Sequence, residues 1–149
     1  MKFLVLLLFL AHSAALLLIA EEKDVATELG NPFEKDEVDK RIERGIRFIM
    51  GKQQPDGSIY DRGNHTTMTS LSLMAMASVG HQPVNPDDKG RVMQRALDFV
   101  LKEDRQSETG YFGAKDGSRM YGHGITTLML SEMLGMGLND KQDRITRER

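Results

Sequence analysis

The stretch that decides the fold is RGIRFIMGKQQPDGSI, residues 44–59, in which one face of a helix leads to a glutamine and then to a turn that contains glycine. A second and weaker copy, RALDFVLKEDRQSETGYF, occupies residues 95–112. Self-similarity of this kind is typical of repeat proteins, in which each unit buries its apolar face only against its neighbours. The sequence therefore predicts two helical repeats, at residues 31–84 and 85–138.

The spacing between the two copies changes along the repeat. Phe48 of the first copy aligns with Phe99 of the second, and farther on Thr69 aligns with Thr126. The partners of the second pair are separated by six more positions than those of the first. The sequence therefore places six additional residues in the second connecting loop.

Each repeat is predicted to contain two unlike helices. In the segments that begin near Asp36 and Asn85, charged residues surround one apolar face, which is typical of an outer helix that faces water. Asp36 is expected to cap the first of these helices together with Asp39. In the other, we expect Asn85 as the N-cap, Pro86 at the first helical position and Asp87 in the first turn.

Two further segments, residues 66–79 and 124–136, carry apolar, serine, threonine and alanine residues all around the helix axis. Helices of this kind are normally buried on every side. Six of the ten methionines lie on them; we interpret these as core packing, with an adaptable lining for an apolar ligand as the alternative. Together the four helices predict an all-α fold in which outer amphipathic helices alternate with inner apolar ones.

Residues 1–20 have the pattern of a secretory signal peptide. Met1 and Lys2 precede an uncharged run from Phe3 to Ala20, and acidic residues follow directly. Because these eighteen residues also approach the length of a membrane span, a retained membrane anchor is the alternative. In both cases we expect an exported chain, periplasmic or secreted, with residues 21–30 as a linker.

The composition argues against several kinds of site. The 20 lysine and arginine residues and the 22 aspartate and glutamate residues are spread along the chain and give a formal net charge of −2, so no basic patch indicates nucleic-acid binding. Cysteine is absent, which excludes disulfides and thiolate sites for a metal or a nucleophile. We expect no metal and no cofactor, and stability that comes from packing.

The first copy carries a distinctive set of residues, Arg44, Gly45, Phe48, Gln53 and Gly57. The second copy keeps Arg95, Ala96, Phe99, Gly110 and Phe112. This pattern resembles the glutamine and tryptophan repeat motif of squalene and oxidosqualene cyclases, and residues 31–138 are similar to the prenyltransferase and squalene cyclase repeat family. The resemblance implies that the helices form part of an α/α toroid. It also implies a structural role for Gln53 and Gly57, as a clamp between an outer helix and the next inner helix.

The chain departs from the family pattern in ways that bear on function. Ile59 and Phe112 stand where the family has tryptophan, and Asp104 stands where the second glutamine is expected. The Asp-x-Asp-Asp acid that a triterpene cyclase would imply is absent, and without cysteine the zinc site of protein prenyltransferases has no counterpart. The sequence therefore favours a non-catalytic module that binds an apolar, isoprenoid-like ligand or a protein. The alternatives are the N-terminal part of a terpenoid cyclase-like enzyme whose catalytic residues lie beyond this chain, and a remnant without independent activity.

Polar residues gather at the expected starts of the two inner helices. Asn64 and His65 open the first, and Tyr121 and His123 open the second. Free N–H groups at a helix N-terminus attract anions, so these four side chains are candidates for a ligand site at one mouth of the toroid. The alternative is that the histidines cap or pack at helix ends. The nearby Asp-Gly-Ser segments, residues 56–58 and 116–118, are interpreted as turns.

Residues 139–149 have the pattern of the opening turns of a third outer helix. Two repeats cannot close a toroid, and repeat arrays need several units and specialised ends to bury their apolar faces. We therefore expect a truncated product that lacks C-terminal repeats, or a chain that pairs with copies of itself or with another chain. Such a chain is expected to associate or to bind an apolar dye.

Overall fold

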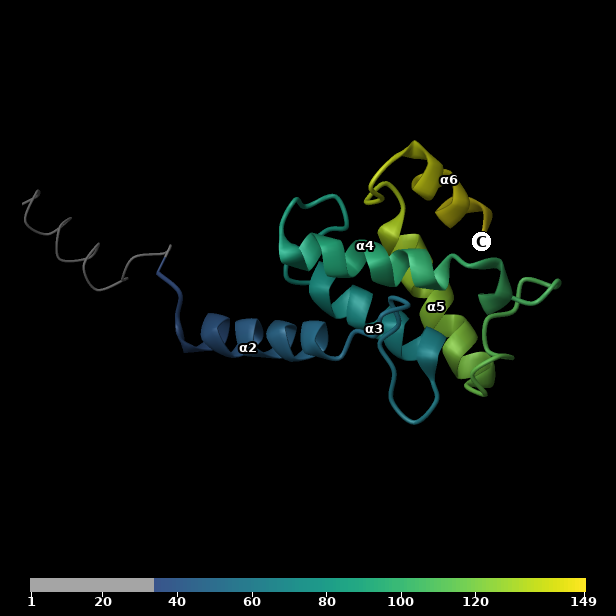
Figure 1. The fold of residues 1–149 in the computed structure, drawn as a ribbon, viewed down its shortest axis with the longest axis horizontal. Coiled ribbons are helices and arrows are strands. Elements are labelled where there is room, and N and C mark those ends of the chain that lie inside the picture. The colour runs from purple at the N-terminus through teal and green to yellow at the C-terminus, as the bar shows by residue number, and fades with distance from the viewer. Residues whose placement is uncertain (1–33) are drawn as a thin grey trace, which may run out of the picture. The chain divides into compact units, whose positions relative to one another are not determined.

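The computed structural model describes residues 34–149 (Figure 1). These residues form five α-helices and one 3₁₀ turn and contain no strand, which confirms the predicted all-α class. The predicted signal peptide and linker, residues 1–30, lie outside the described residues. None of the described helices has the length and apolar character that a membrane span requires. The elements are α2 (Glu37–Gly51), α3 (His65–Ala77), α4 (Asp88–Val100), η1 (Glu103–Arg105), α5 (Arg119–Met133) and α6 (Asp140–Glu148).

Helix α2 begins where the sequence predicts. The backbone N–H of Asp39 donates to Asp36 Oδ1 at 2.9 Å, and that of Asp36 donates to Asp39 Oδ2 at 3.2 Å. Two N–H groups that the helix leaves free are thereby satisfied reciprocally. Toward the other end of α2, Ile46 is buried in the core, with Ile49 and Met50 packed against it.

The expected start of α4 is wrong by two residues. The N-cap is Asp87, whose carboxylate accepts a hydrogen bond from the N–H of Gly90 at 2.8 Å, and Pro86 lies outside the helix. Asn85 Oδ1 instead accepts from the N–H of Gln82 in the preceding turn. A carboxylate is a stronger acceptor than an amide at the positive end of a helix, which accounts for the choice of Asp87.

Helix α5 extends farther toward the N-terminus than the sequence pattern indicates. It begins at Arg119 rather than near Gly124. It ends at Met133 rather than Met136, because the backbone leaves the helical region at the next residue and Gly135 has a φ of +79°. The predicted termination by glycine is therefore confirmed, three residues early.

The two inner helices, α3 and α5, differ in burial. A Cβ at Gly122 would collide with the hydroxyl oxygens of Thr67 and Ser118, so the α5 backbone passes directly against α3. Another face of α5 is open to solvent, where Tyr121 is 71% and Leu128 is 50% exposed. The prediction that inner helices are buried on every side is therefore wrong for α5.

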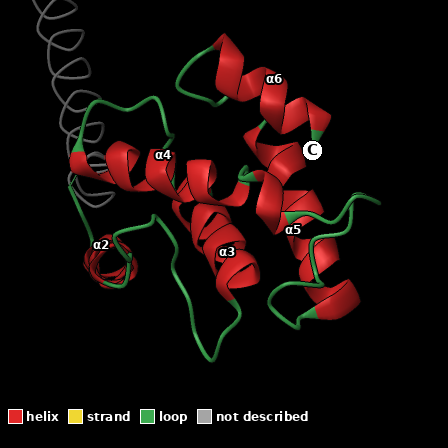
Figure 2. Ribbon diagram, turned by 45° about the vertical axis from the view of Figure 1, so that its right-hand side comes forward, coloured by secondary structure: helices red, strands yellow, loops and turns green. Residues whose placement is uncertain are grey.

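The core forms around α3, which packs against both α4 and α5, while α5 packs against α6 (Figures 1 and 2). A hydrogen bond of 3.1 Å between the hydroxyls of Ser70 and Thr126 joins the two inner helices. These side chains are small, so the helices approach closely and both hydroxyls remain paired. Core packing is confirmed for Met76, Met129 and Met133 of the inner helices, which are buried, and Met93 of α4 is buried with them.

The same glutamine arrangement holds both connecting loops. Gln53 Nε2 donates to the carbonyl oxygen of Gly57 at 3.1 Å and to a carbonyl oxygen of α4 at 2.8 Å. Gln106 Nε2 donates to the carbonyl oxygen of Gly110 at 3.0 Å and to that of Arg149, at the end of α6, at 2.8 Å. Each glutamine therefore ties its own loop to a later helix.

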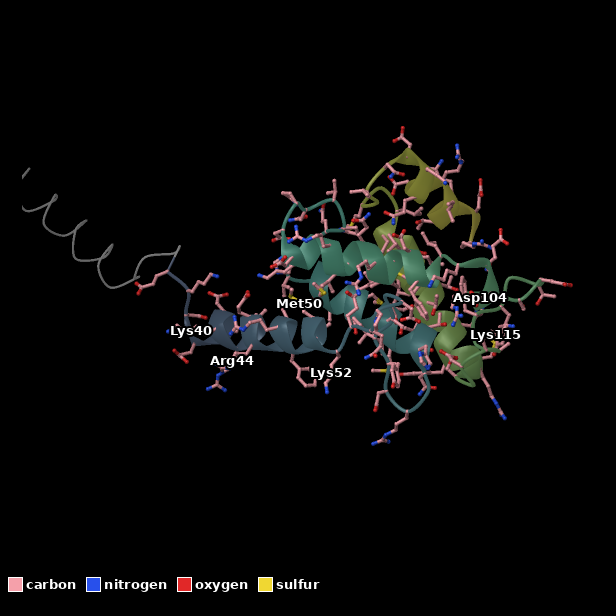
Figure 3. All side chains as sticks on the ribbon, in the orientation of Figure 1. Lys40, Arg44, Met50, Lys52, Asp104 and Lys115 are labelled. Carbon is pink, nitrogen blue, oxygen red and sulfur yellow. The ribbon has the colours of Figure 1, made fainter. Side chains whose placement is uncertain are left out.

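Gln106 thus holds the position that the sequence pattern assigns to Asp104, and that assignment is wrong. Asp104 lies on η1 (Figure 3). Gln106 follows Phe99 by seven residues, whereas Gln53 follows Phe48 by five, so two of the six additional residues precede Gln106. The remaining four of the six additional residues follow Phe112, ahead of α5. The second loop is longer as predicted, and its extra length is divided around the glutamine.

Candidate functional site

The predicted site residues have different local surroundings. Asn64 is the N-cap residue of α3, but its side chain makes no capping hydrogen bond. His65 is the first residue of α3, and its ring stacks on that of Tyr60 with 4.4 Å between the centroids. Tyr121 lies inside α5, because that helix begins two residues earlier, and its side chain is exposed. The start of α3 is therefore as predicted, whereas Tyr121 does not open its helix.

His123 packs against aromatic side chains of its own repeat. Its ring centroid is 5.1 Å from that of Tyr111 and 6.2 Å from that of Phe112. Its Nδ1 is buried and makes no hydrogen bond with the described residues. The matching position of the first repeat is Thr66, whose buried Oγ1 also has no partner. Because His123 stands where the other repeat has a buried threonine, its position favours packing over ligand binding.

Asp116, which the sequence pattern assigns only to a turn, occupies the N-terminus of α3. Its Oδ2 accepts from the N–H of Thr67 at 3.1 Å and from the hydroxyl of that residue at 3.0 Å. Its Oδ1 accepts from the N–H of Ser118 at 3.1 Å and from the Ser118 hydroxyl. Helix N-termini favour negative charge. The anion that was expected at the start of α3 is therefore a carboxylate of the chain itself.

Hydrogen bonding keeps this carboxylate ionised. Burial raises the pKa of Asp116, but the hydrogen bonds from Ser118 and Thr67 together lower it further, so that it lies below the ordinary value of 3.8. Asp56 forms a turn of the same kind at another position of the first repeat, in which its carboxylate accepts from the hydroxyl of Ser58 at 2.7 Å and from the N–H of Ser58 at 3.0 Å. These two bonds lower the pKa of Asp56. Both Asp-Gly-Ser segments are turns, as predicted.

A further carboxylate with a lowered pKa lies in the second connecting loop. The hydrogen bond from Arg105 lowers the pKa of Asp104 most, and the charges of Lys102 and Lys115 add to it (Figure 3). This carboxylate belongs to an exposed group of opposite charges. Within residues 34–149, no three His, Asp or Glu side chains are placed to hold a metal ion.

An open cleft of about 540 Å³ lies between the end of α2, the loop after it and α3. Clefts of roughly 300–1,000 Å³ with apolar walls and a few polar groups have the size and composition of small-molecule sites. The apolar part of the wall consists of Phe48, Ile49, Ile59, Tyr60, Met68, Leu71 and Ala75. The polar part consists of Lys52, Asp61 and Ser72.

Phe48 shows how this cleft differs from the second repeat. Its side chain is 65% exposed, whereas its counterpart Phe99 is 1% exposed. The two rings have similar cationic neighbours, since Lys52 Nζ lies 5.2 Å from the Phe48 centroid and Lys102 Nζ lies 5.1 Å from that of Phe99. Lys52 follows α2 directly (Figure 3). The first repeat therefore leaves open an apolar surface that the second repeat buries.

The sequence pattern names Phe48 and Met68 for other reasons and places neither in a site. Phe48 belongs to the repeat motif, and Met68 belongs to the methionines of the first inner helix. The motif itself carries no signal for the open cleft, because Phe48 and Phe99 occupy the same motif position and differ only in how the rest of the fold covers them.

Comparison with known proteins found no matching family model, no matching curated protein and no matching solved structure.

Proposed function

We propose that this chain is an exported, non-catalytic helical-repeat module that holds an apolar small molecule in the cleft between α2 and α3. The observation that carries the proposal is the volume of about 540 Å³ bounded by aromatic and aliphatic side chains, with Phe48 65% exposed. Large apolar side chains gathered on one surface are a common mark of a binding site.

Apolar burial supplies the driving force. Each Å² of apolar surface that leaves water contributes about 25 cal/mol, so roughly 300 Å² of surface on ligand and protein together contributes about 7 kcal/mol. Association and ordering costs reduce this gain. Because about 7 kcal/mol alone corresponds to a dissociation constant of roughly 10 μM, we expect weaker binding than this, with dissociation constants of roughly 0.1–1 mM for an apolar molecule that fills the cleft.

The polar wall residues favour one kind of ligand. Asp61 lies 3.7 Å from the guanidinium of Arg62, so its charge already has a partner. The ammonium of Lys52 lies over the ring of Phe48, at the edge of the cleft. A molecule with an apolar body and an uncharged or anionic end would place that end beside Lys52. Long-chain alcohols and carboxylates fit this description.

The proposal includes an architecture. The matching hydrogen bonds of Gln53 and Gln106 support an arc of an α/α toroid, like that of prenyltransferase and squalene cyclase repeats. Such a resemblance suggests isoprenoid alcohols as the first ligands to try. Export of the chain is proposed from residues 1–20 alone.

The test uses Nile red, an apolar dye whose fluorescence rises on binding, and farnesol as a competitor. Leu71 lines the cleft, and Leu128 is its counterpart on α5 in the second repeat. We expect Leu71→Trp, which fills the cleft, to weaken dye binding at least tenfold, whereas Leu128→Trp leaves it unchanged. Circular dichroism would verify that both variants remain helical.

Two results would contradict the proposed site. One is dye binding that Leu71→Trp and Leu128→Trp reduce equally, since the dye would then bind apolar surface without preference for the cleft. The other is dye binding that farnesol does not displace at millimolar concentration. Lys52→Ala, which leaves the apolar wall in place, should weaken a fatty carboxylate more than farnesol.

A further inference from the structure

A second apolar surface lies away from the cleft, on α5. We call it the α5 free face. The exposed fractions of its largest side chains are 68% for Met120, 71% for Tyr121 and 50% for Leu128. It consists of Met120, Tyr121, Gly124, Thr127, Leu128 and Ser131, all of which are exposed.

The repeat indicates what kind of element covers this face. Thr67 and Ser70 of α3 are buried, and both contact the second repeat. The hydroxyl of Thr67 is hydrogen-bonded to that of Ser118, and the hydroxyl of Ser70 to that of Thr126 on α5. The counterparts of these two α3 residues in the second repeat are Gly124 and Thr127, which are exposed. The α5 free face therefore corresponds to the face of α3 that a neighbouring helix covers. A helix is the expected occupant.

The same face is complementary to itself. Met120, Gly124, Thr127 and Ser131 are spaced four, three and four residues apart, so they form one line along α5. In an antiparallel pair of α5 helices centred between Gly124 and Thr127, each Gly124 meets the Thr127 of the other copy. Each Met120 likewise meets a Ser131, so that in each pair the larger side chain faces the smaller one and the two helices can pack closely.

Charge and flanking residues agree with this pairing. Across a two-fold axis a charged residue near the centre would face its own copy and repel it, and the α5 sequence from Met120 to Ser131 contains no Asp, Glu, Lys or Arg. Tyr121 and Leu128 lie on the same side of the line, and the antiparallel pairing brings each Tyr121 next to the Leu128 of the other copy. The exposed area of both side chains would then be covered.

A head-to-tail arrangement fits less well. The Gln53 clamp ties the first loop to α4, and the Gln106 clamp ties the second loop to α6. Helix α6 therefore takes beside α5 the place that α4 takes beside α3. If a second copy continued the order of the repeats, its own α2 would have to occupy the position beside α5 that α6 already fills. The two-fold arrangement leaves α6 where it is.

We propose that two copies of this chain associate through the α5 free face, as a two-fold symmetric pair with antiparallel α5 helices. Two-fold dimers are the commonest closed assemblies. A single helix face offers less than the roughly 800 Å² per partner of a standard interface. The dimer is therefore weak, and its population depends on concentration in the micromolar range.

Sedimentation equilibrium of the full chain tests the interface. We expect a monomer–dimer equilibrium whose dissociation constant rises at least tenfold in Thr127→Arg. Gln82→Arg adds the same charge at an exposed position between α3 and α4, outside both the cleft and the α5 free face, and should leave the equilibrium unchanged. A chain that stays monomeric at all concentrations up to 200 μM (~20 times the expected dissociation constant of the dimer) would overturn the proposal. Association that Thr127→Arg does not weaken would also overturn it.

Cross-linking tests the direction of the helices, because the chain has no cysteine of its own. Mixed Met120→Cys and Ser131→Cys chains should form a disulfide between the two variants on oxidation. Neither variant alone should cross-link, since like positions would be separated by about 16 Å along the axis, too far for a disulfide. Cross-linking of each variant with itself would overturn the antiparallel arrangement. Nile red binding by Thr127→Arg, which should equal that of the unaltered chain, separates failure of the dimer from failure of the cleft.

Discussion

Gln53 and Gln106 make matching hydrogen bonds in the two repeats: each side-chain amide donates to the carbonyl oxygen of the glycine four residues later and to a carbonyl oxygen of a later helix. The backbone of the two loops matches as well. The N–H after each glutamine donates to the carbonyl oxygen four residues on, at 2.8 Å in the first loop and 2.9 Å in the second. The two repeats therefore share the hydrogen bonds of their loops, although their helix sequences have low similarity.

Replacing either glutamine should loosen the helix that it holds. Gln53→Ala removes the donor for two carbonyl groups in a partly buried position, and leaving such acceptors without a donor costs about 1–3 kcal/mol. Gln54→Ala is the control, because that side chain makes an exposed bond to a carbonyl two residues away. Urea denaturation would measure both. A loss for Gln53→Ala no larger than that for Gln54→Ala would mean that the clamp is not structural.

The glycine of the first loop is needed for two separate reasons. Gly57 has a φ of +94°, and an added Cβ would collide with the carbonyl oxygen of Arg95. Gly63 has a φ of +88° but faces open space. Gly63→Ala should therefore show the conformational cost alone, about 1–2 kcal/mol. Gly57→Ala should lose about 1–3 kcal/mol more from the steric clash. Thermal unfolding measures the stability of both variants. Equal losses of stability for Gly57→Ala and Gly63→Ala would show that the loop moves away from α4 without cost.

Local rules account for the parts of the fold that the sequence predicts well. The cap of α2 involves residues three positions apart. Helix α6 begins as expected after Asn139, its N-cap, whose side chain accepts from the N–H of Gln142 at 3.0 Å. The start of α5 depends on distant residues. Glycine is usually a helix breaker, but Gly122 is retained inside α5 because Thr67, on the other inner helix, leaves no room for a side chain.

The candidate site is less predictable from the sequence for a similar reason. Phe48 and Phe99 occupy the same motif position, and only packing with the rest of the fold makes one exposed and the other buried. The second glutamine was predictable, since Gln106 and Gly110 keep the four-residue spacing of Gln53 and Gly57. Aligning the loop separately from the helix would have found it.

Acid should weaken the link between the two inner helices. The folded chain holds the pKa of Asp116 below 3.8, so the unfolded chain binds more protons in this range. The stabilisation is complete above about pH 4 and is lost as the pH falls through the folded pKa. Asp116→Asn should cost about 0.5–2 kcal/mol at pH 7, as for loss of a helix cap. The difference from the unaltered chain should shrink as the pH falls below about 4.

Thermal unfolding at several pH values measures this effect. Asp61→Asn is the control, because its carboxylate makes only an exposed ion pair with Arg62. A difference between Asp116→Asn and the unaltered chain that stays constant down to pH 2.5 (roughly one unit below an ordinary Asp pKa) would show that ionisation of Asp116 does not stabilise the fold.

Two glycines of α5, two residues apart, should respond to alanine in opposite directions. Gly124 has open space around its Cα, so Gly124→Ala should stabilise the helix by about 0.5–1 kcal/mol through reduced backbone freedom in the unfolded chain. Gly122 lies against Thr67 and Ser118, so Gly122→Ala should force α5 away from α3 and destabilise the chain by about 1–3 kcal/mol. Both variants have the same composition, and thermal unfolding followed by circular dichroism compares them directly at a concentration where the chain is monomeric, so that contacts of Gly124 with a second copy do not contribute. Because the close approach also aligns Ser70 with Thr126, Gly122→Ala in a Ser70→Ala background should cost less than in the unaltered chain. Additive losses would mean that the hydroxyl pair does not depend on the close approach of the two helices at Gly122.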